Sequence, residues 1–203
     1  MNIHTDQAII TANGGLHSQR ALETAHGILT RHDLRQPVLF HLVLTGGQIA
    51  NYQATVKALV RRLRTYGCRC EYFGAYEAAE DKGGIHAHCF VLIETSKKQP
   101  FETILNVNDG KYLHKLADRH KIDRIHVAKP KNPIHDGQFF ARPVEADGKL
   151  ANCLAWVQYI YKKRSKADVA RRETYFNSEF HSNIAKSMAA KRAAGYVAGA
   201  VSA

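Results

Sequence analysis

The chain has 203 residues, with 29 Lys and Arg against 18 Asp and Glu, and a formal net charge of +11. A chain this basic attracts phosphate, so its charge favours a nucleic-acid partner whose binding weakens with salt. We find no secretory signal and no apolar run approaching the eighteen or so residues of a membrane span. We therefore expect no membrane partner and a cytoplasmic location. The length predicts one main domain with a tail.

The first segment, residues 1–37, is polar and rich in His. Within it, residues 17–31 show an apolar stripe at helical spacing, made by Ala21, Leu22, Ala25, Ile28 and Leu29. This pattern predicts an extra helix that packs against the core.

The main domain is expected at residues 38–163. Its hydrophobic pattern predicts, in chain order, a strand over 38–45, a helix over 52–66, strands over 68–77 and 86–94, a helix over 109–120 and a strand over 122–127. This β-α-β-β-α-β order predicts an α+β fold with an antiparallel sheet and helices on one face, in the RRM-like or ferredoxin-like arrangement.

Two further segments complete the chain. Residues 128–148 contain Pro130, Pro133 and Pro143, which exclude a long helix and leave a loop or hairpin over a DNA channel, or a plain surface connection. Residues 164–203 are basic and helix-permissive, with aromatic anchors at Tyr175, Phe176 and Phe180, and we expect a helical extension. The four cysteines form no Cys-x-x-Cys pair, which favours reduced buried thiols over a zinc site.

The strand over residues 86–94 begins with two histidines separated by one residue. Successive strand residues point to opposite faces, so His86 and His88 project the same way and can converge on one cation. Glu77 lies across a predicted glycine-rich turn and would complete a site of two nitrogens and one oxygen. The alternative is two histidines on a half-buried strand, since 12 His in 203 residues give roughly 0.7 His-x-His pairs by chance.

A helix is predicted over residues 150–163. Its apolar stripe consists of Leu150, Cys153, Leu154, Val157, Ile160 and Tyr161. A neighbouring face of the helix carries Asn152, Trp156, Tyr159, Lys162 and Lys163. Tyr159 and Lys162 are three residues apart and therefore adjacent on the helix surface. We interpret Tyr161 as a packing residue and Tyr159 as the exposed tyrosine.

Three motifs in this order resemble those of the HUH-superfamily endonucleases, in particular the rolling-circle replication initiator (Rep) proteins of plasmids and filamentous-phage-like elements. The motifs are the apolar strand ending in Thr at 40–45, His86-Ala87-His88, and Tyr159-Ile160-Tyr161-Lys162. Relaxases usually place their tyrosine before the histidine motif, so the order here argues against that branch. The resemblance implies an RRM-like domain with its metal site on the open face of the sheet.

The resemblance also implies a site-specific DNA nicking and joining enzyme. Tyr159 would attack a phosphodiester, giving a 5′-phosphotyrosine link and a free 3′-OH that primes replication, and the same site would later rejoin the strand. Lys162 would orient the phosphate or favour the phenolate. A divalent cation, Mg²⁺ or Mn²⁺, would bind His86, His88 and Glu77.

The expected partner is single-stranded DNA or an origin hairpin. The basic residues predicted to contact it are Arg61, Arg62 and Arg64 in the first core helix, Lys129 and Lys131 in the proline-containing loop, and Lys163 and Arg164 after the tyrosine. No Walker A pattern is present, so a host helicase would have to supply any unwinding that is needed. The sequence leaves the oligomeric state open.

Three other functions use parts of the same pattern. A single-tyrosine transposase would share the histidine pair, the later tyrosine and the chemistry, but would act as a dimer on hairpins at transposon ends. A non-catalytic RRM-like module would bind single strands by stacking bases on residues such as Tyr72 or Phe73. A metal-dependent nuclease without a covalent step would need the histidines but not Tyr159.

Overall fold

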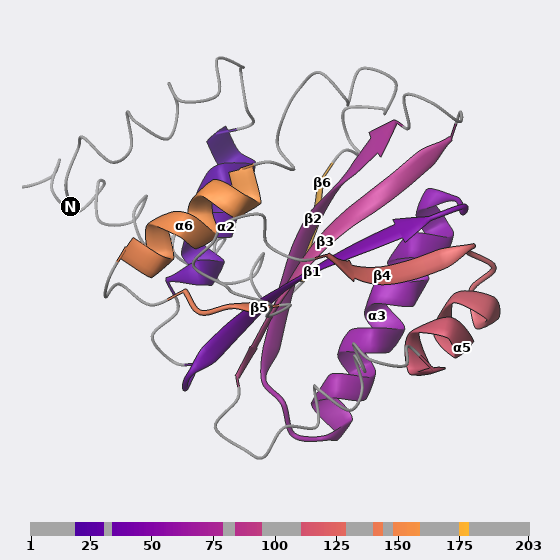
Figure 1. The fold of residues 1–203 in the computed structure, drawn as a ribbon, viewed down its shortest axis with the longest axis horizontal. Helices are drawn as coiled ribbons and strands as arrows, with labels where there is room; N and C mark the ends of the chain where they lie inside the picture. The colour runs from indigo at the N-terminus through magenta and orange to yellow at the C-terminus, as the bar shows by residue number, and fades with distance from the viewer. Residues whose placement is uncertain are drawn as a thin grey trace, which may run out of the picture.

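The computed structural model of the chain describes residues 19–30, 34–78, 84–94, 111–128, 140–143, 148–158 and 175–178. These residues form an α+β structure in which helices cover an antiparallel sheet (Figure 1). The described helices are α2 (Gln19–Leu29), α3 (Ile49–Thr65), α5 (Lys111–Arg119) and α6 (Lys149–Gln158). The described strands are β1 (Pro37–Thr45), β2 (Cys70–Ala78), β3 (Ile85–Glu94), β4 (Arg124–Ala128), β5 (Phe140–Ala141) and β6 (Tyr175–Asn177).

The strands lie in the order β4-β1-β3-β2-β6, with the short β5 also paired to β1. Every pairing is antiparallel. The succession β1-α3-β2-β3-α5-β4 is the predicted one, and each element begins and ends within a few residues of its expected position. With β3 between β1 and β2, this topology is compatible with a ferredoxin-like fold.

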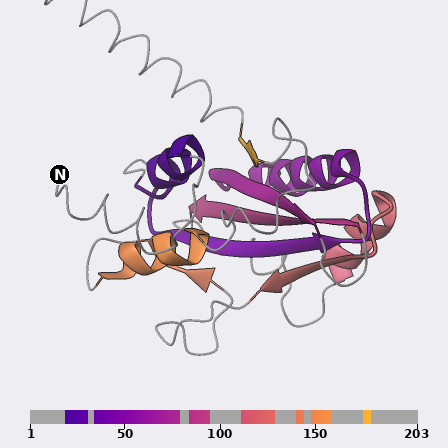
Figure 2. The same cartoon turned by 90° about the horizontal axis from the view of Figure 1, so that it is seen from above.

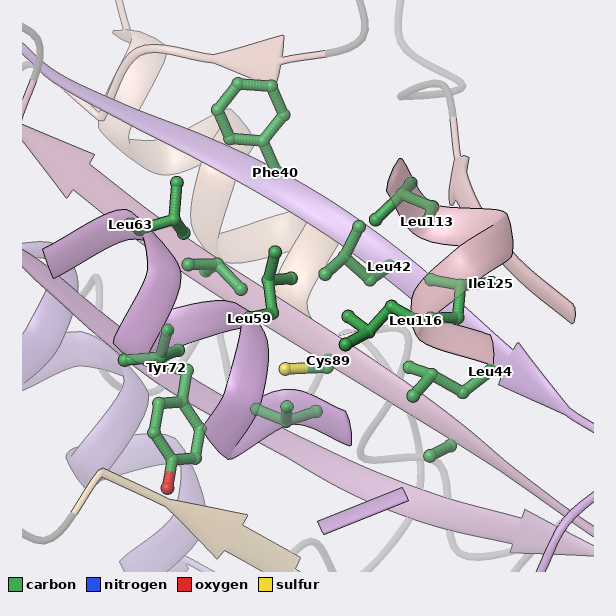
Figure 3. Close-up of a cluster of buried hydrophobic side chains, with 14 of the residues drawn as sticks. Phe40, Leu42, Leu44, Leu59, Leu63, Tyr72, Cys89, Leu113, Leu116 and Ile125 are labelled. Carbon is green, nitrogen blue, oxygen red and sulfur yellow. The ribbon is translucent and has the colours of Figure 1, made fainter. Parts of the chain in front are cut away.

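One face of the sheet is covered by α3 and α5. Leu59 and Leu63 of α3 and Leu116 of α5 are almost fully buried and pack on alternate residues of the strands, such as Leu42 and Cys89 (Figure 3). The apolar stripe of α3 explains this contact, and the helix lies alongside the sheet in Figure 2. The helix stops before Gly67, which has a φ of 79° and so adopts the left-handed conformation that glycine tolerates best.

The opposite face is covered in part by α2 and α6, which lie side by side (Figure 1). Ile28 of α2 and Val157 of α6 join Leu39, Phe73 and Phe90 in a second apolar cluster. The expected extra helix of the N-terminal segment is therefore confirmed. The expectation of helices on one face holds for the core helices α3 and α5 but not for α2 and α6, which shield the other face of strands that are apolar on both sides.

A second correction concerns β6, since residues 175–177 form a strand where the sequence predicted a helix. Phe176 pairs with Gly74 of β2, and its ring lies where a β-carbon on Gly74 would stand. The backbone N–H of Ser178 donates to Tyr72 (2.8 Å), and its hydroxyl donates to the carboxylate of Glu71. A glycine in the middle of an aromatic strand thus makes room for this added edge strand.

The four cysteines are buried and unpaired, which confirms the prediction of reduced thiols. Burial raises the pKa of the Cys70 thiol to about 11 and that of Cys153 to about 12. No helix in the described part of the chain combines the length and apolar character needed to cross a bilayer.

Candidate metal centre

The register of β2 and β3 brings the three predicted ligands together. Glu77 pairs directly with His86, and Ala75 pairs with His88. Cys89 and Ala87 point into the core under α3, so strand alternation places His86 and His88 on the other face. We call this the site face, because Glu77 also projects from it.

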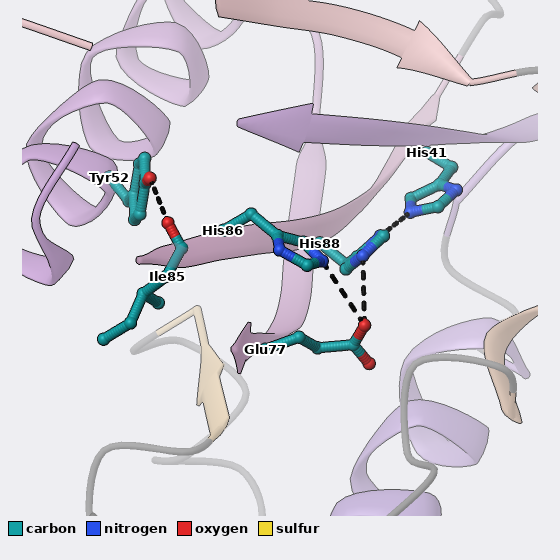
Figure 4. A network of polar contacts seen from close by, with 6 residues as sticks. All are labelled: His41, Tyr52, Glu77, Ile85, His86 and His88. Atoms are coloured by element: carbon teal, nitrogen blue, oxygen red, sulfur yellow. Dashed lines mark hydrogen bonds and ion pairs between the residues drawn. The ribbon is translucent and has the colours of Figure 1, made fainter. Parts of the chain in front are cut away.

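The two histidines present the same ring nitrogen to one carboxylate oxygen (Figure 4). The Glu77 Oε2 atom lies 3.5 Å from Nε2 of His86 and 3.3 Å from Nε2 of His88. The two imidazole rings meet at 71° with centroids 4.9 Å apart, so both edges face the same point. Glu77 and His88 are buried, whereas His86 retains 22 % exposure of its side chain.

These distances fit a cation between the three side chains. Two ligands that bind one cation at about 2.1 Å and at 90–110° lie roughly 3.0–3.4 Å apart. All three candidate ligand atoms lie within 4.8 Å of one another. Glu77, His86 and His88 can therefore hold a metal ion, and the partial exposure of His86 leaves one side accessible to solvent or phosphate.

A third histidine, His41 of β1, lies directly behind His88. Nε2 of His41 lies 2.9 Å from Nδ1 of His88, a hydrogen bond between two buried rings. The His41 ring also stacks on Phe90 at 4.4 Å between centroids. Burial, followed by the nearby His88 and His126 rings, lowers the pKa of His41 to about 3, so its imidazole is neutral at pH 7.

The helix that precedes the predicted nucleophile reaches this cluster. Trp156 of α6 contacts both His41 and Phe90 edge-on, with ring centroids 5.7 Å and 5.1 Å apart. The last residue of α6 is Gln158. Tyr159, Lys162, Lys163 and Arg164 follow it and lie outside the described residues, as do Lys129 and Lys131.

The structure separates the predicted basic residues of α3 from the site. Arg61, Arg62 and Arg64 are exposed, but α3 covers the face of the sheet opposite Glu77 and the histidines. Arg62 donates to the hydroxyl of Tyr66 (2.7 Å) and lies over its ring, and Arg64 donates to the carbonyl of Cys70 (3.1 Å). These three residues therefore do not join the metal ligands in one surface.

The sequence pattern did not place two further residues on the site face. Arg124 of β4 is exposed and pairs with Thr45, and it alternates with the buried Ile125, so it shares the face of the metal ligands. Tyr175 of β6 pairs with Ala75, and burial together with the Glu77 charge raises the pKa of its phenol. Strand alternation in 122–127 could have placed Arg124, but nothing in the sequence indicated β6.

Comparisons with protein-family models, with curated proteins and with solved structures gave no match to this chain.

Proposed function

We propose that the protein is a metal-dependent, single-strand DNA endonuclease and strand transferase of the HUH rolling-circle initiator kind. The observation that carries the proposal is the convergence of the His86 and His88 Nε2 atoms on the Glu77 carboxylate, on a sheet face that α6 partly covers. The topology compatible with a ferredoxin-like fold supports assigning residues 38–163 as the HUH nuclease domain. The net charge of +11 supports a DNA partner.

The contact between Trp156 and His41 supports Tyr159 as the nucleophile. Trp156 is three residues before Tyr159 in the sequence. Its ring contacts His41, which hydrogen-bonds the proposed ligand His88. A tyrosine that follows the end of α6 by one residue is therefore close in sequence to a side chain that touches the site. Tyr175 is the weaker choice, because its raised pKa disfavours the phenolate.

The proposed reaction is a transesterification. The phenolic oxygen of Tyr159 bonds to phosphorus, and the bond from phosphorus to the 3′ oxygen breaks. The tyrosine proton leaves to solvent, and the departing 3′ oxygen takes up a proton to become a free 3′-OH. A Mg²⁺ or Mn²⁺ ion held by Glu77, His86 and His88 would supply stabilisation of the charge on the phosphate oxygens. Lys162 would orient the same phosphate.

The reverse reaction accounts for strand joining. The phosphotyrosine link keeps the phosphodiester bond energy, so attack by a 3′-OH restores the DNA strand and releases Tyr159 without ATP. A single-tyrosine transposase would use the same chemistry, and the DNA that neighbours the gene discriminates between the two.

A cleavage assay tests this proposal. Labelled single-stranded DNA from the replicon that encodes the protein is incubated with the full chain and Mn²⁺, and the ends of the products are examined. We expect a 3′ end that a polymerase extends and a 5′ end that resists kinase labelling even after phosphatase and protease treatment, because a tyrosyl peptide stays esterified to the 5′ phosphate. Addition of a chelator, or the substitution His88→Ala, should abolish cleavage. Binding without cleavage across several candidate origins would favour the non-catalytic module.

A further inference from the structure

We propose that His41 is a positioning residue that holds the proton of His88 on Nδ1. The Nε2 atom of His88 is thereby kept unprotonated, as metal binding requires. This inference rests on the proposed metal site of Glu77, His86 and His88. It concerns a residue that touches neither the cation nor the DNA.

The argument begins with the two nitrogens of His88. Its Nε2 atom faces Glu77 at 3.3 Å, and its Nδ1 atom faces His41 at 2.9 Å. A neutral imidazole carries one proton, and only the nitrogen without it can coordinate a cation. Metal binding through Nε2 therefore requires the proton of His88 to be on Nδ1, where His41 is the group that can accept it.

His41 suits this role because its ring is held from two sides. It stacks nearly parallel on Phe90, with 6° between the planes, and Trp156 meets it at 85°. Its exposed fraction is 5 %, so water does not compete freely for Nε2. In many metal sites a carboxylate or carbonyl oxygen accepts the second proton of a histidine ligand, and here the acceptor would be an imidazole.

His126 offers a matched control on the same face. Val43 of β1 pairs with His88 on one side and with His126 on the other, so both histidines belong to one row across the sheet. His126 is thus a neighbouring, partly buried imidazole on the same face, yet the ring that hydrogen-bonds His88 is His41.

The test measures Mn²⁺ affinity of the full chain by calorimetry, with Co²⁺ absorption as a spectroscopic readout of the ligand field. His41→Phe keeps the stack on Phe90 and removes the acceptor, whereas His41→Gln keeps an acceptor oxygen. We expect His41→Phe to bind Mn²⁺ about 10- to 100-fold more weakly and to change the Co²⁺ spectrum. His41→Gln should recover most of the affinity, and His126→Phe should bind like the wild type.

A second measurement needs no variant. Nitrogen-15 spectra of the wild-type chain with saturating Mg²⁺ report which ring nitrogen carries each proton. We expect both His88 and His41 to be protonated at Nδ1, and a proton on Nε2 of His41 would overturn the inference. Wild-type affinity in a folded His41→Phe protein would also overturn it while leaving the proposed function intact. Normal metal binding without DNA cleavage would instead contradict the proposed function alone, and no binding by the wild type would overturn both.

Discussion

The indole of Trp156 meets the imidazole of His41 edge-on, with 5.7 Å between the ring centroids and 85° between the planes. This contact joins α6 to the strand that lies behind the candidate metal ligands. Because His41 in turn hydrogen-bonds His88, a side chain near the end of α6 is two contacts away from the candidate ligand His88. The relationship links α6, which ends one residue before Tyr159 in the sequence, to the candidate ligand His88.

The first prediction concerns that link. Trp156→Ala should lower the rate of DNA cleavage at least 10-fold, because the end of α6 loses its aromatic contact with the site and a small misplacement of a nucleophile is costly. Mn²⁺ affinity should change much less, since Trp156 contacts no ligand directly. Trp156→Phe keeps an aromatic edge and should retain most of the rate. Equal losses of rate in both variants, with the fold intact, would contradict this explanation.

The second prediction concerns metal binding and stability. A cation that binds only the folded chain stabilises it by about 2.7 kcal/mol at 100 times its dissociation constant. Mn²⁺ should therefore raise the unfolding temperature of the wild type and leave that of Glu77→Gln nearly unchanged. Glu94→Gln is the matched control, because Glu94 lies at the end of β3 far from His86 and His88, and it should respond like the wild type. A full shift in Glu77→Gln would remove this carboxylate from the site.

The third prediction concerns acid stability of the metal-free chain. His41 is surrounded by His88 of β3, His126 of β4, Glu77 of β2 and the apolar edge of Trp156, and its pKa falls from 6.5 to about 3 on folding. Between these values the unfolded chain binds more protons than the folded one. The contribution of neutral His41 is therefore complete above pH 6.5 and is lost progressively toward pH 3, at no more than about 1.4 kcal/mol per pH unit.

Urea unfolding in the presence of a chelator measures that slope, at several pH values from above 6.5, where the contribution is complete, down into the window between 6.5 and about 3. The free energy of unfolding should decrease on acidification, and His41→Phe should show a shallower decrease than the wild type. Identical slopes in the two proteins would show that His41 does not titrate in this way.

The fourth prediction concerns the DNA path. Arg124 lies on the site face, whereas Arg61 lies on α3 across the sheet. If the DNA strand follows the site face, Arg124→Gln should weaken single-stranded DNA binding. It should also reduce the slope of log affinity against log salt concentration by about the amount that one phosphate contact contributes. Arg61→Gln removes the same charge from the opposite side and should have a smaller effect. Binding measured by fluorescence anisotropy at several salt concentrations distinguishes the two, and a larger loss in Arg61→Gln would move the DNA to α3.

The sequence pattern predicted the core of the fold well, because its strands and helices have strong and distinct periodicities. The stripe from Tyr52 to Leu63 indicates α3, and the alternation at His86 and His88 places both rings on one face. The pairing of Glu77 with His86 also followed from a hairpin between β2 and β3. β2 and β3 are neighbours in the sequence, so the short connection between them limits the register of their pairing.

The remaining features depend on contacts between distant parts of the chain. His41 is 47 residues from His88, and its role became visible only when β1 and β3 were paired. The strand at Tyr175 depends on the space above Gly74, about a hundred residues earlier in the sequence, and its helix-permissive composition concealed it. Periodicity describes one element at a time and does not report such packing.

The most direct test of the central claim is a denaturing gel of the full chain with labelled single-stranded DNA and Mn²⁺. The wild type is compared with Tyr159→Phe, with His86→Ala, and with Tyr161→Phe as the matched tyrosine control. We predict a protein-linked DNA band in the wild type and in Tyr161→Phe, and none in Tyr159→Phe or His86→Ala. A band that persists in Tyr159→Phe and disappears in Tyr161→Phe would contradict the assignment of the nucleophile. Cleavage without any protein-linked band would contradict the covalent mechanism.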